Sequence, residues 1–122
     1  MDRIVLGLSE KIILNNKELI AKIDTGAKGN SICETIIKDL NIPYIEKKIW
    51  VKSSNGRQLR RMVEAEIKIK DKTFTTTFNV TDRTHLKFPV LIGVQTLKEG
   101  FLVDPSINQY IDYSKHPELY TK

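Results

Sequence analysis

The sequence predicts a mainly β domain with one or two short helices, and three observations support this class. The chain has 122 residues, 40% of them hydrophobic and only 7% aromatic, which is typical of one compact domain with an aliphatic core. Apolar and polar residues alternate over much of its length, which is the period of a half-buried strand. Pairs of Asn and Gly separate the apolar runs, as they do in β-hairpins.

The first half of the chain contains a hairpin and a helix. Residues 12–14 and 18–23 are apolar runs on either side of Asn15-Asn16, so we expect two antiparallel strands joined by a turn. The second strand leads directly into residues 24–26. A short helix is expected over residues 33–40, because its Ile and Leu residues recur at helical spacing.

The second half continues as strands. The Asn55-Gly56 pair predicts another hairpin, because both residues accept a positive φ at low cost. We expect a strand over 49–51 to enter this hairpin and a return strand over 59–69 to leave it, followed by a turn over 70–72 and a strand over 74–80. A strand buried on both faces is expected over 88–93. One or two helical turns over 94–99 and a last strand over 101–105 complete the predicted elements. Apolar periodicity then fades. We therefore expect a domain over residues 1–106 and a C-terminal tail over 107–122.

Charge and cysteine content narrow the functional class. Twenty Lys and Arg against fifteen Asp and Glu give a net charge of +5, but the signs alternate along the chain, so we expect no nucleic-acid partner. The nearest approach to a basic cluster is Arg57, Arg60 and Arg61. The apolar start of the chain is too short to span a bilayer, and we expect no membrane association. The single cysteine, Cys33, favours the reducing cytoplasm and a place in the core.

The residues with the clearest chemical meaning are Asp24-Thr25-Gly26. In many proteins such a tripeptide is only a turn, because Asp accepts backbone hydrogen bonds and Gly allows a positive φ. Here it ends a hydrophobic strand. A Gly-tipped hairpin and then a strand with two apolar residues and a glycine, Leu91-Ile92-Gly93, follow it in the chain.

This order of motifs resembles the retropepsins, single-domain aspartic proteases, and implies a retropepsin-like closed β-barrel. A narrower resemblance is to the bacterial family that carries the label ATP-dependent zinc protease, some members of which accompany glutamate ligases that modify a ribosomal protein. It covers residues 12–106. The stretches that carry it are Ala21-Lys22-Ile23-Asp24-Thr25-Gly26-Ala27-Lys28, Val51-Lys52-Ser53-Ser54-Asn55-Gly56, Thr81-Asp82-Arg83, Phe88-Pro89-Val90-Leu91-Ile92-Gly93 and Gly100-Phe101-Leu102-Val103-Asp104-Pro105-Ser106. Gly29-Asn30 stands where the family usually carries small hydroxyl residues, so the substrate groove is expected to differ.

The resemblance implies an aspartic endopeptidase in which two carboxylates act on one water molecule. Two carboxylates about 3 Å apart cannot both ionise, so they share a proton. This chain has one Asp-Thr-Gly, and a homodimer that pairs Asp24 with its twin is therefore expected. The alternative is a non-catalytic peptide-binding or assembly module on the same fold.

The resemblance also assigns roles to residues. Asp24, Thr25 and Gly26 form the catalytic group. Substrate binding is expected from Ala27 and Lys28 beside the catalytic loop and from Ser53, Ser54, Asn55 and Gly56, which would close over the peptide as a flap. Leu91, Ile92 and Gly93 would support the catalytic loop. The substrate is a peptide or protein, and it would be acidic if the association with glutamate ligases applies to this chain.

No metal or cofactor is expected, despite the family label. The chain has two histidines, His85 and His116, and no His-Glu-x-x-His element or Gly-x-x-x-x-Gly-Lys loop. Cys33 lacks a recognisable base partner in the sequence, so we interpret it as a core residue rather than a nucleophile. Asp82 and Asp104 are interpreted as a turn residue and a strand-end residue, with a substrate contact as the alternative.

Overall fold

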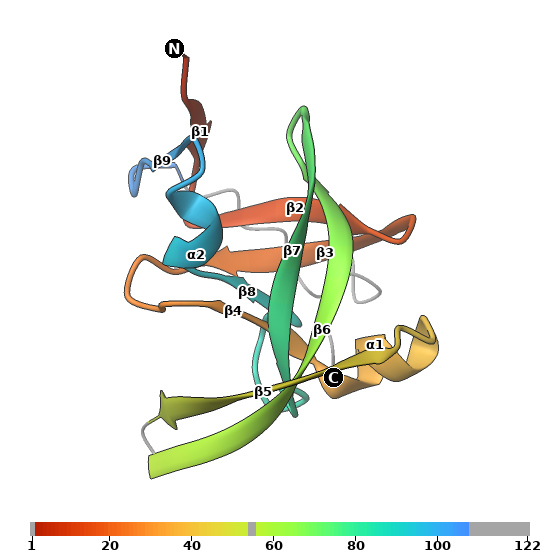
Figure 1. The fold of residues 1–122 in the computed structure, drawn as a ribbon. Coiled ribbons are helices and arrows are strands. Elements are labelled where there is room, and N and C mark those ends of the chain that lie inside the picture. Colours follow the sequence, from red (N-terminus) through yellow and green to blue (C-terminus); the bar gives the residue numbers. More distant parts are fainter. Residues whose placement is uncertain (1, 54–55, 108–122) are drawn as a thin grey trace.

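The computed structural model describes residues 2–53 and 56–107, which form nine strands and two short helices (Figure 1). In chain order these are β1 (Ile4–Leu6), β2 (Ser9–Leu14), β3 (Lys17–Ile23), β4 (Asn30–Cys33), α1 (Glu34–Asp39), β5 (Tyr44–Ser53), β6 (Gly56–Ile69), β7 (Lys72–Thr81), β8 (Val90–Ile92), α2 (Val94–Leu97) and β9 (Phe101–Val103).

Six of the strands close into a barrel. Their order is β2-β3-β8-β4-β7-β6, and β6 returns to β2 through the antiparallel pairs Ile12–Ile69 and Leu14–Ile67. Strand β5 extends the sheet beyond β6, and β1 and β9 form a separate parallel pair. The predicted fold class, a mainly β retropepsin-like closed barrel with one or two short helices, is confirmed.

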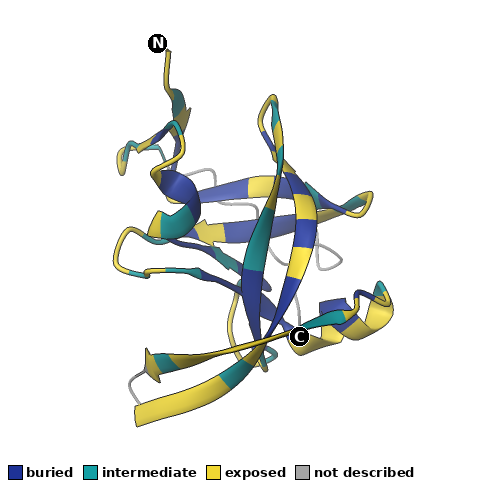
Figure 2. Ribbon diagram, in the orientation of Figure 1, coloured by how far each residue is buried: buried dark blue, intermediate teal, exposed yellow. Residues whose placement is uncertain are grey.

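The interior of the barrel is aliphatic with one central aromatic ring. Phe78 is the largest of the fully buried side chains. Along the second half of β6 the buried residues alternate with exposed ones (Figure 2). The fully or almost fully buried side chains that share one core cluster with Phe78 include Leu6, Ile12, Leu14, Leu19, Ile32, Ile37, Val63, Ile67, Ile69 and Ile92. Burial of these apolar side chains is the main stabilising contribution to the fold.

The predicted turns are present where the structure describes them. Asn15 and Asn16 have φ angles of 48° and 66°, the left-handed pair that suits a two-residue hairpin loop. Lys70 also has a positive φ, at the turn between β6 and β7. In the third hairpin Ser53 pairs with Gly56, whose φ is 100°. Ser54 and Asn55, predicted to lie at its tip, are outside the described residues.

The predicted helix is one residue shorter at each end. Cys33 is the residue before α1 and is completely buried, as expected for a core cysteine. Ile36 and Ile37 pack into the core, and the helix ends where the Leu40 N–H donates to the Ile36 carbonyl and Asn41 takes a positive φ. Within the described ranges, no helix combines the length and the apolar character that crossing a bilayer requires.

The predicted strand over 88–93 needed correction in its bounds and in its burial. The run 88–93 is a strand only over Val90–Ile92, because Pro89 has no N–H to donate to a ladder. It is buried on one face rather than two: Val90 and Ile92 are fully buried, whereas Leu91 faces outward and is partly exposed. The prediction of a tail over 107–122 remains a prediction, since residues 108–122 lie outside the described part of the chain.

We predict that Phe78→Ala lowers the free energy of unfolding by about 3–5 kcal/mol, because it removes the central ring and leaves a cavity among aliphatic side chains. Urea denaturation followed by circular dichroism measures this change. Leu86→Ala is the control, because Leu86 is half exposed and its truncation should cost less than about 0.5 kcal/mol. Equal losses in the two variants would contradict the burial that the fold assigns to Phe78.

Candidate active site

Asp24 follows the last residue of β3 and is fixed by the neighbouring strand. Its N–H donates to the Ile92 carbonyl at 2.9 Å, which continues the parallel register of β3 with β8. Its carboxylate is partly exposed, with Oδ1 accepting the Gly26 N–H at 2.9 Å and Oδ2 lying 3.9 Å from the Lys22 ammonium. The Asp24 carboxylate therefore accepts one backbone hydrogen bond, lies at the edge of ion-pair distance from Lys22, and remains accessible to solvent.

The loop that carries Asp24 is held by the start of α2. The N–H of Val94 donates to the Ala27 carbonyl at 2.8 Å, and the N–H of Gln95 donates to the Lys28 carbonyl at 2.8 Å. These are among the first N–H groups of a helix, which have no partner within it. The predicted catalytic loop and the predicted support segment, Leu91-Ile92-Gly93, therefore lie side by side, as the sequence interpretation required.

Gly93 is the point of closest approach between these segments. A Cβ atom placed on Gly93 would meet the carbonyl oxygen of Gly29 and would lie 2.7 Å from that of Ala27. Both obstacles are backbone atoms, so they cannot rotate away. Only glycine allows the loop to cross so close to the end of β8.

Asn30 fixes the same crossing with its side chain. It is almost fully buried, and its Oδ1 accepts the Gly93 N–H at 3.0 Å. Its Nδ2 donates to the Thr96 hydroxyl at 2.8 Å and to the Thr77 carbonyl at 3.1 Å. Gly29-Asn30 differs from the small hydroxyl residues that the similar family usually carries there, and this difference was expected to alter the substrate groove. The structure shows that Asn30 supports the loop from below, and the change in the substrate groove stays a prediction.

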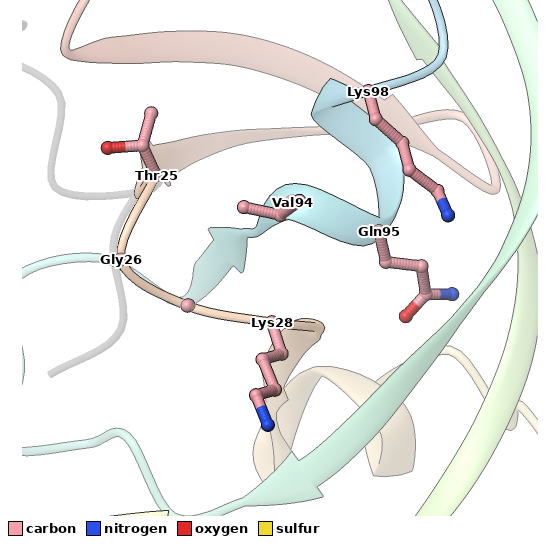
Figure 3. A pocket seen from close by; sticks show the side chains of 7 residues that line it. Thr25, Gly26, Lys28, Val94, Gln95 and Lys98 are labelled. Atoms are coloured by element: carbon pink, nitrogen blue, oxygen red, sulfur yellow. The ribbon is translucent and has the colours of Figure 1, made fainter.

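A shallow pocket of about 320 Å³ opens beside the catalytic loop (Figure 3). It is lined by Thr25, Gly26, Ala27 and Lys28 from the loop and by Val94, Gln95 and Lys98 from α2 and its end. Thr25 and Gly26 are exposed in the single chain. The two lysines make this rim of the pocket positively charged.

The predicted flap residues belong to a different part of the molecule. Ser53 and Gly56 lie at the end of the β5–β6 hairpin, which projects beyond the barrel and is largely exposed (Figures 1 and 2). The Arg57 guanidinium covers the Trp50 ring at 4.8 Å, and Arg61 covers Tyr44 at 3.6 Å. The single chain thus joins Asp24–Lys28 with Leu91–Gly93. None of the described hairpin residues lines the pocket beside Asp24.

The two further aspartates of the family motifs lie in turns. Asp82 Oδ1 accepts hydrogen bonds from the N–H and the hydroxyl of Thr84, at 2.9 and 2.6 Å, and these bonds lower the pKa of Asp82. Asp104 makes the same pair of bonds with Ser106, which lowers the pKa of Asp104. Both arrangements fit the turn and strand-end interpretation.

Sequence reasoning missed a group of polar residues on the outer face of the barrel. Asn79 is buried and accepts hydrogen bonds at Oδ1 from the Ser31 hydroxyl and from Arg60 Nη1, at 2.8 and 2.9 Å. Arg83 is also buried, and its Nε donates to the Phe88 carbonyl at 2.9 Å. An Asn between Phe78 and Val80 in an alternating strand was the available signal, because alternation places Asn79 opposite the core.

The described residues contain no cluster of side chains that could bind a metal ion. Within residues 2–53 and 56–107, His, Cys, Asp and Glu form no group of three or more that could bind an ion. Cys33 is a buried free thiol. The zinc in the family label is not confirmed.

Comparisons with known proteins identify one family and many similar solved structures, one of which is described below. The model of the RimB-like family, described as retropepsin-like aspartic endopeptidase RimB, matches residues 37–114, a span that begins after Asp24-Thr25-Gly26. The crystal structure of Lpg0085 from Legionella pneumophila subsp. pneumophila strain Philadelphia 1, a protein of unknown function (DUF785), is 29% identical with a TM-score of 0.65. The alignment covers 86% of this chain and 95% of that one. No curated protein matches.

We predict that Gly93→Ala destabilises the fold by about 1–3 kcal/mol, because the added methyl group meets two backbone carbonyls. Gly29→Ala is the matched control, since its Cβ would meet only the end of the flexible Gln95 side chain, at 3.3 Å. Thermal and urea denaturation measure both. A Gly93→Ala variant as stable as the control would contradict the crossing described above.

Proposed function

Because this chain belongs to the RimB-like family of retropepsin-like aspartic endopeptidases, we propose that it hydrolyses peptide bonds as a homodimer in which two copies of Asp24 activate one water molecule. The observation that carries the proposal is the Asp24 carboxylate. It is held at the end of a buried strand by the Gly26 N–H, yet it remains partly exposed. A rigid, accessible carboxylate is what a general base requires.

The exposed loop supports the pairing of two chains. Thr25 and Gly26 are exposed beside Asp24, so a second copy can approach this surface without unfolding the first. In such a dimer the Thr25 hydroxyls would join the two loops. A symmetric contact of this kind supplies the second carboxylate that one chain lacks.

The chemistry proceeds without a covalent enzyme intermediate. One Asp24 carboxylate takes a proton from water while the other, protonated, transfers its proton to the scissile carbonyl oxygen. The water oxygen bonds to the carbonyl carbon and forms a tetrahedral diol. The C–N bond then breaks as the first Asp24 gives its proton to the amine nitrogen and the second takes one back from a diol hydroxyl, and the products are a carboxylic acid and an amine.

The substrate is an extended peptide that lies between the catalytic loops and the hairpin flaps. Ala27 and Lys28 would contact it beside Asp24, and Ser53, Ser54, Asn55 and Gly56 would close over it. No cofactor takes part in these steps. The same fold could instead hold a peptide without cleaving it, and the experiment below separates these two roles.

We predict that Asp24→Asn lowers peptidase activity on a mixed peptide library by about 10³-fold or more, measured by mass spectrometry at several pH values between about 4 and 8. The amide cannot act as a base, whereas the loop keeps its shape. Asp71→Asn is the matched control, because Asp71 is exposed at the turn between β6 and β7, away from the site, and its activity should equal that of the wild type.

Sedimentation velocity of the same samples shows whether each variant still forms a dimer, so that loss of catalysis can be distinguished from loss of assembly. Loss of cleavage in an Asp24→Asn variant that still dimerises supports the proposal. Equal activity of Asp24→Asn and wild type would exclude Asp24 from catalysis, and a wild type that binds library peptides without cutting them would favour the non-catalytic module.

A further inference from the structure

The β5–β6 hairpin extends beyond the barrel, and one of its faces combines cations with exposed apolar side chains (Figures 1 and 2). Residues that pair directly in a sheet share a face, and every second residue of a strand returns to it. Each strand of the hairpin places an apolar residue between two cations on this face, and all six residues are exposed. We call it the hairpin basic face, and its direct pairs are Lys48 with Arg61, Trp50 with Leu59 and Lys52 with Arg57.

The hairpin basic face is turned away from Asp24. Arg60 lies between two of its residues in β6 and therefore points to the opposite side, where its Nη1 donates to Asn79 Oδ1 at 2.9 Å. From Asn79 this opposite side continues through directly paired residues of β4 and β8 to Lys22, whose ammonium lies 3.9 Å from Asp24. A ligand on the hairpin basic face would leave the Asp24 side free, so the inference below does not depend on the proposed function.

Two of the three pairs on this face bring like charges together. Lys48 lies directly opposite Arg61, and Lys52 lies directly opposite Arg57. Like charges in such positions destabilise a sheet. Among the residues that the structure describes, no carboxylate lies within ion-pair distance of any of these four cations. The hairpin therefore carries a repulsion in two places, and a bound anion would relieve it.

Carboxylates lie beside the barrel end of this face without neutralising it. Glu34 and Asp82 line the same hollow of about 320 Å³ as Arg61. Glu34 forms its ion pair with Lys38, at 3.0 Å, and Asp82 accepts hydrogen bonds within its own turn. Glu46 lies in the bulge that precedes the face in β5. None of the three forms an ion pair with the four cations, whose charge stays available to an external anion.

The centre of the face is aromatic. Trp50 is 57% exposed, the largest fraction among the large hydrophobic residues that the structure describes, and Leu59 beside it is 46% exposed. The Arg57 guanidinium covers the Trp50 ring at 4.8 Å. Unpaired nucleobases stack on aromatic rings and on the planes of Arg side chains, and positive charge beside such rings holds the phosphates.

From this geometry we propose that the hairpin basic face binds a single-stranded nucleic acid. The four cations contact phosphates, and an unpaired base stacks on Trp50. Arg57 and Arg61 are four residues apart, about 13 Å along a strand, so the face engages a short stretch of the ligand. The sequence predicted no nucleic-acid partner because the charge signs alternate along the chain. The register of β5 with β6 gathers one sign on one face, and for this reason the inference departs from that expectation.

The position of Trp50 favours a single strand over a duplex or a membrane. Bases within a duplex are stacked on one another and do not offer their faces to a side chain. Trp50 and Leu59 lie between the cations rather than beyond them, so inserting them into a bilayer would bury charge. Phosphates and base faces are common to RNA and DNA, and we expect both kinds of strand to bind.

Fluorescence anisotropy of the full chain with fluorescein-labelled oligonucleotides tests the inference. The probes are single-stranded RNA and single-stranded DNA of about 15 nucleotides, and a duplex of the same length. We expect both single strands to bind more tightly than the duplex. Contact with four phosphates predicts a slope of about −3 when the logarithm of the binding constant is plotted against that of the salt concentration. Failure to bind either single strand at low salt, or equal affinity for the duplex, overturns the inference.

Variants of the hairpin locate the binding surface. Trp50→Ala should weaken binding about 5- to 100-fold, and Trp50→Phe, which keeps a ring, should lose less. Lys52→Glu should weaken binding about 10-fold or more, yet melt at or above the wild-type temperature, because it replaces a like-charge pair by an ion pair with Arg57. A role limited to stability would not separate these two readouts. If Lys52→Glu is instead less stable, Trp50→Ala decides, since Trp50 is exposed and its loss leaves the fold intact.

Lys68→Glu is the matched control, because it makes the same charge change at an exposed position of β6 within the barrel. It lies seven residues beyond Arg61, more than two Debye lengths away at physiological salt, so its affinity should stay within about twofold of the wild type. Equal losses in Lys52→Glu and Lys68→Glu would reduce the effect to net charge and overturn the inference. Sedimentation with phosphatidylserine vesicles completes the test: binding to vesicles but to neither single strand would assign the face to a membrane and overturn it as well.

Discussion

The crossing of the loop that carries Asp24 over Gly93 is the contact on which the rest of the candidate site depends. The backbone of Ala27 and Gly29 passes so close to Gly93 that no side chain fits between them, and Asn30 binds the Gly93 N–H from below. A buried amide is costly unless its donors and acceptors are satisfied, and those of Asn30 all reach the strands and helix around it. This arrangement fixes the backbone of Asp24 at the end of β3, while the Asp24 carboxylate remains partly exposed to solvent.

Local chemistry made much of the fold predictable. The turns at Asn15-Asn16 and over 70–72 were predicted from the sequence, and Asn15, Asn16 and Lys70 take positive φ angles there. Residues of β6 alternate between buried and exposed positions as the sequence does. The parallel pairing of β1 with β9 and the short strand β4 were not foreseen. Each depends on partners far away in the chain, and neither segment carries a turn signal or a long alternation of its own.

The sequence predicted the centre of the candidate site, and the structure adds polar residues on the neighbouring barrel face. Asp24 was located because the motif and its order with Leu91-Ile92-Gly93 can be read directly. Arg57, Arg60 and Arg61 formed a single basic cluster in the sequence, but strand alternation sends Arg60 to the face of Asp24 and the others to the opposite face. That distinction requires the register of β6 against β7, and this register is a property of the folded sheet.

The central claim is that two copies of Asp24 make one site, and a mixed-chain titration tests it most directly. Wild type and Asp24→Asn chains are combined at constant total concentration, allowed to exchange, and assayed for cleavage. If both carboxylates are needed, an equal mixture retains about one quarter of the wild-type rate, because only dimers of two intact chains are active. A rate near one half would mean that each chain works alone, and would contradict the account.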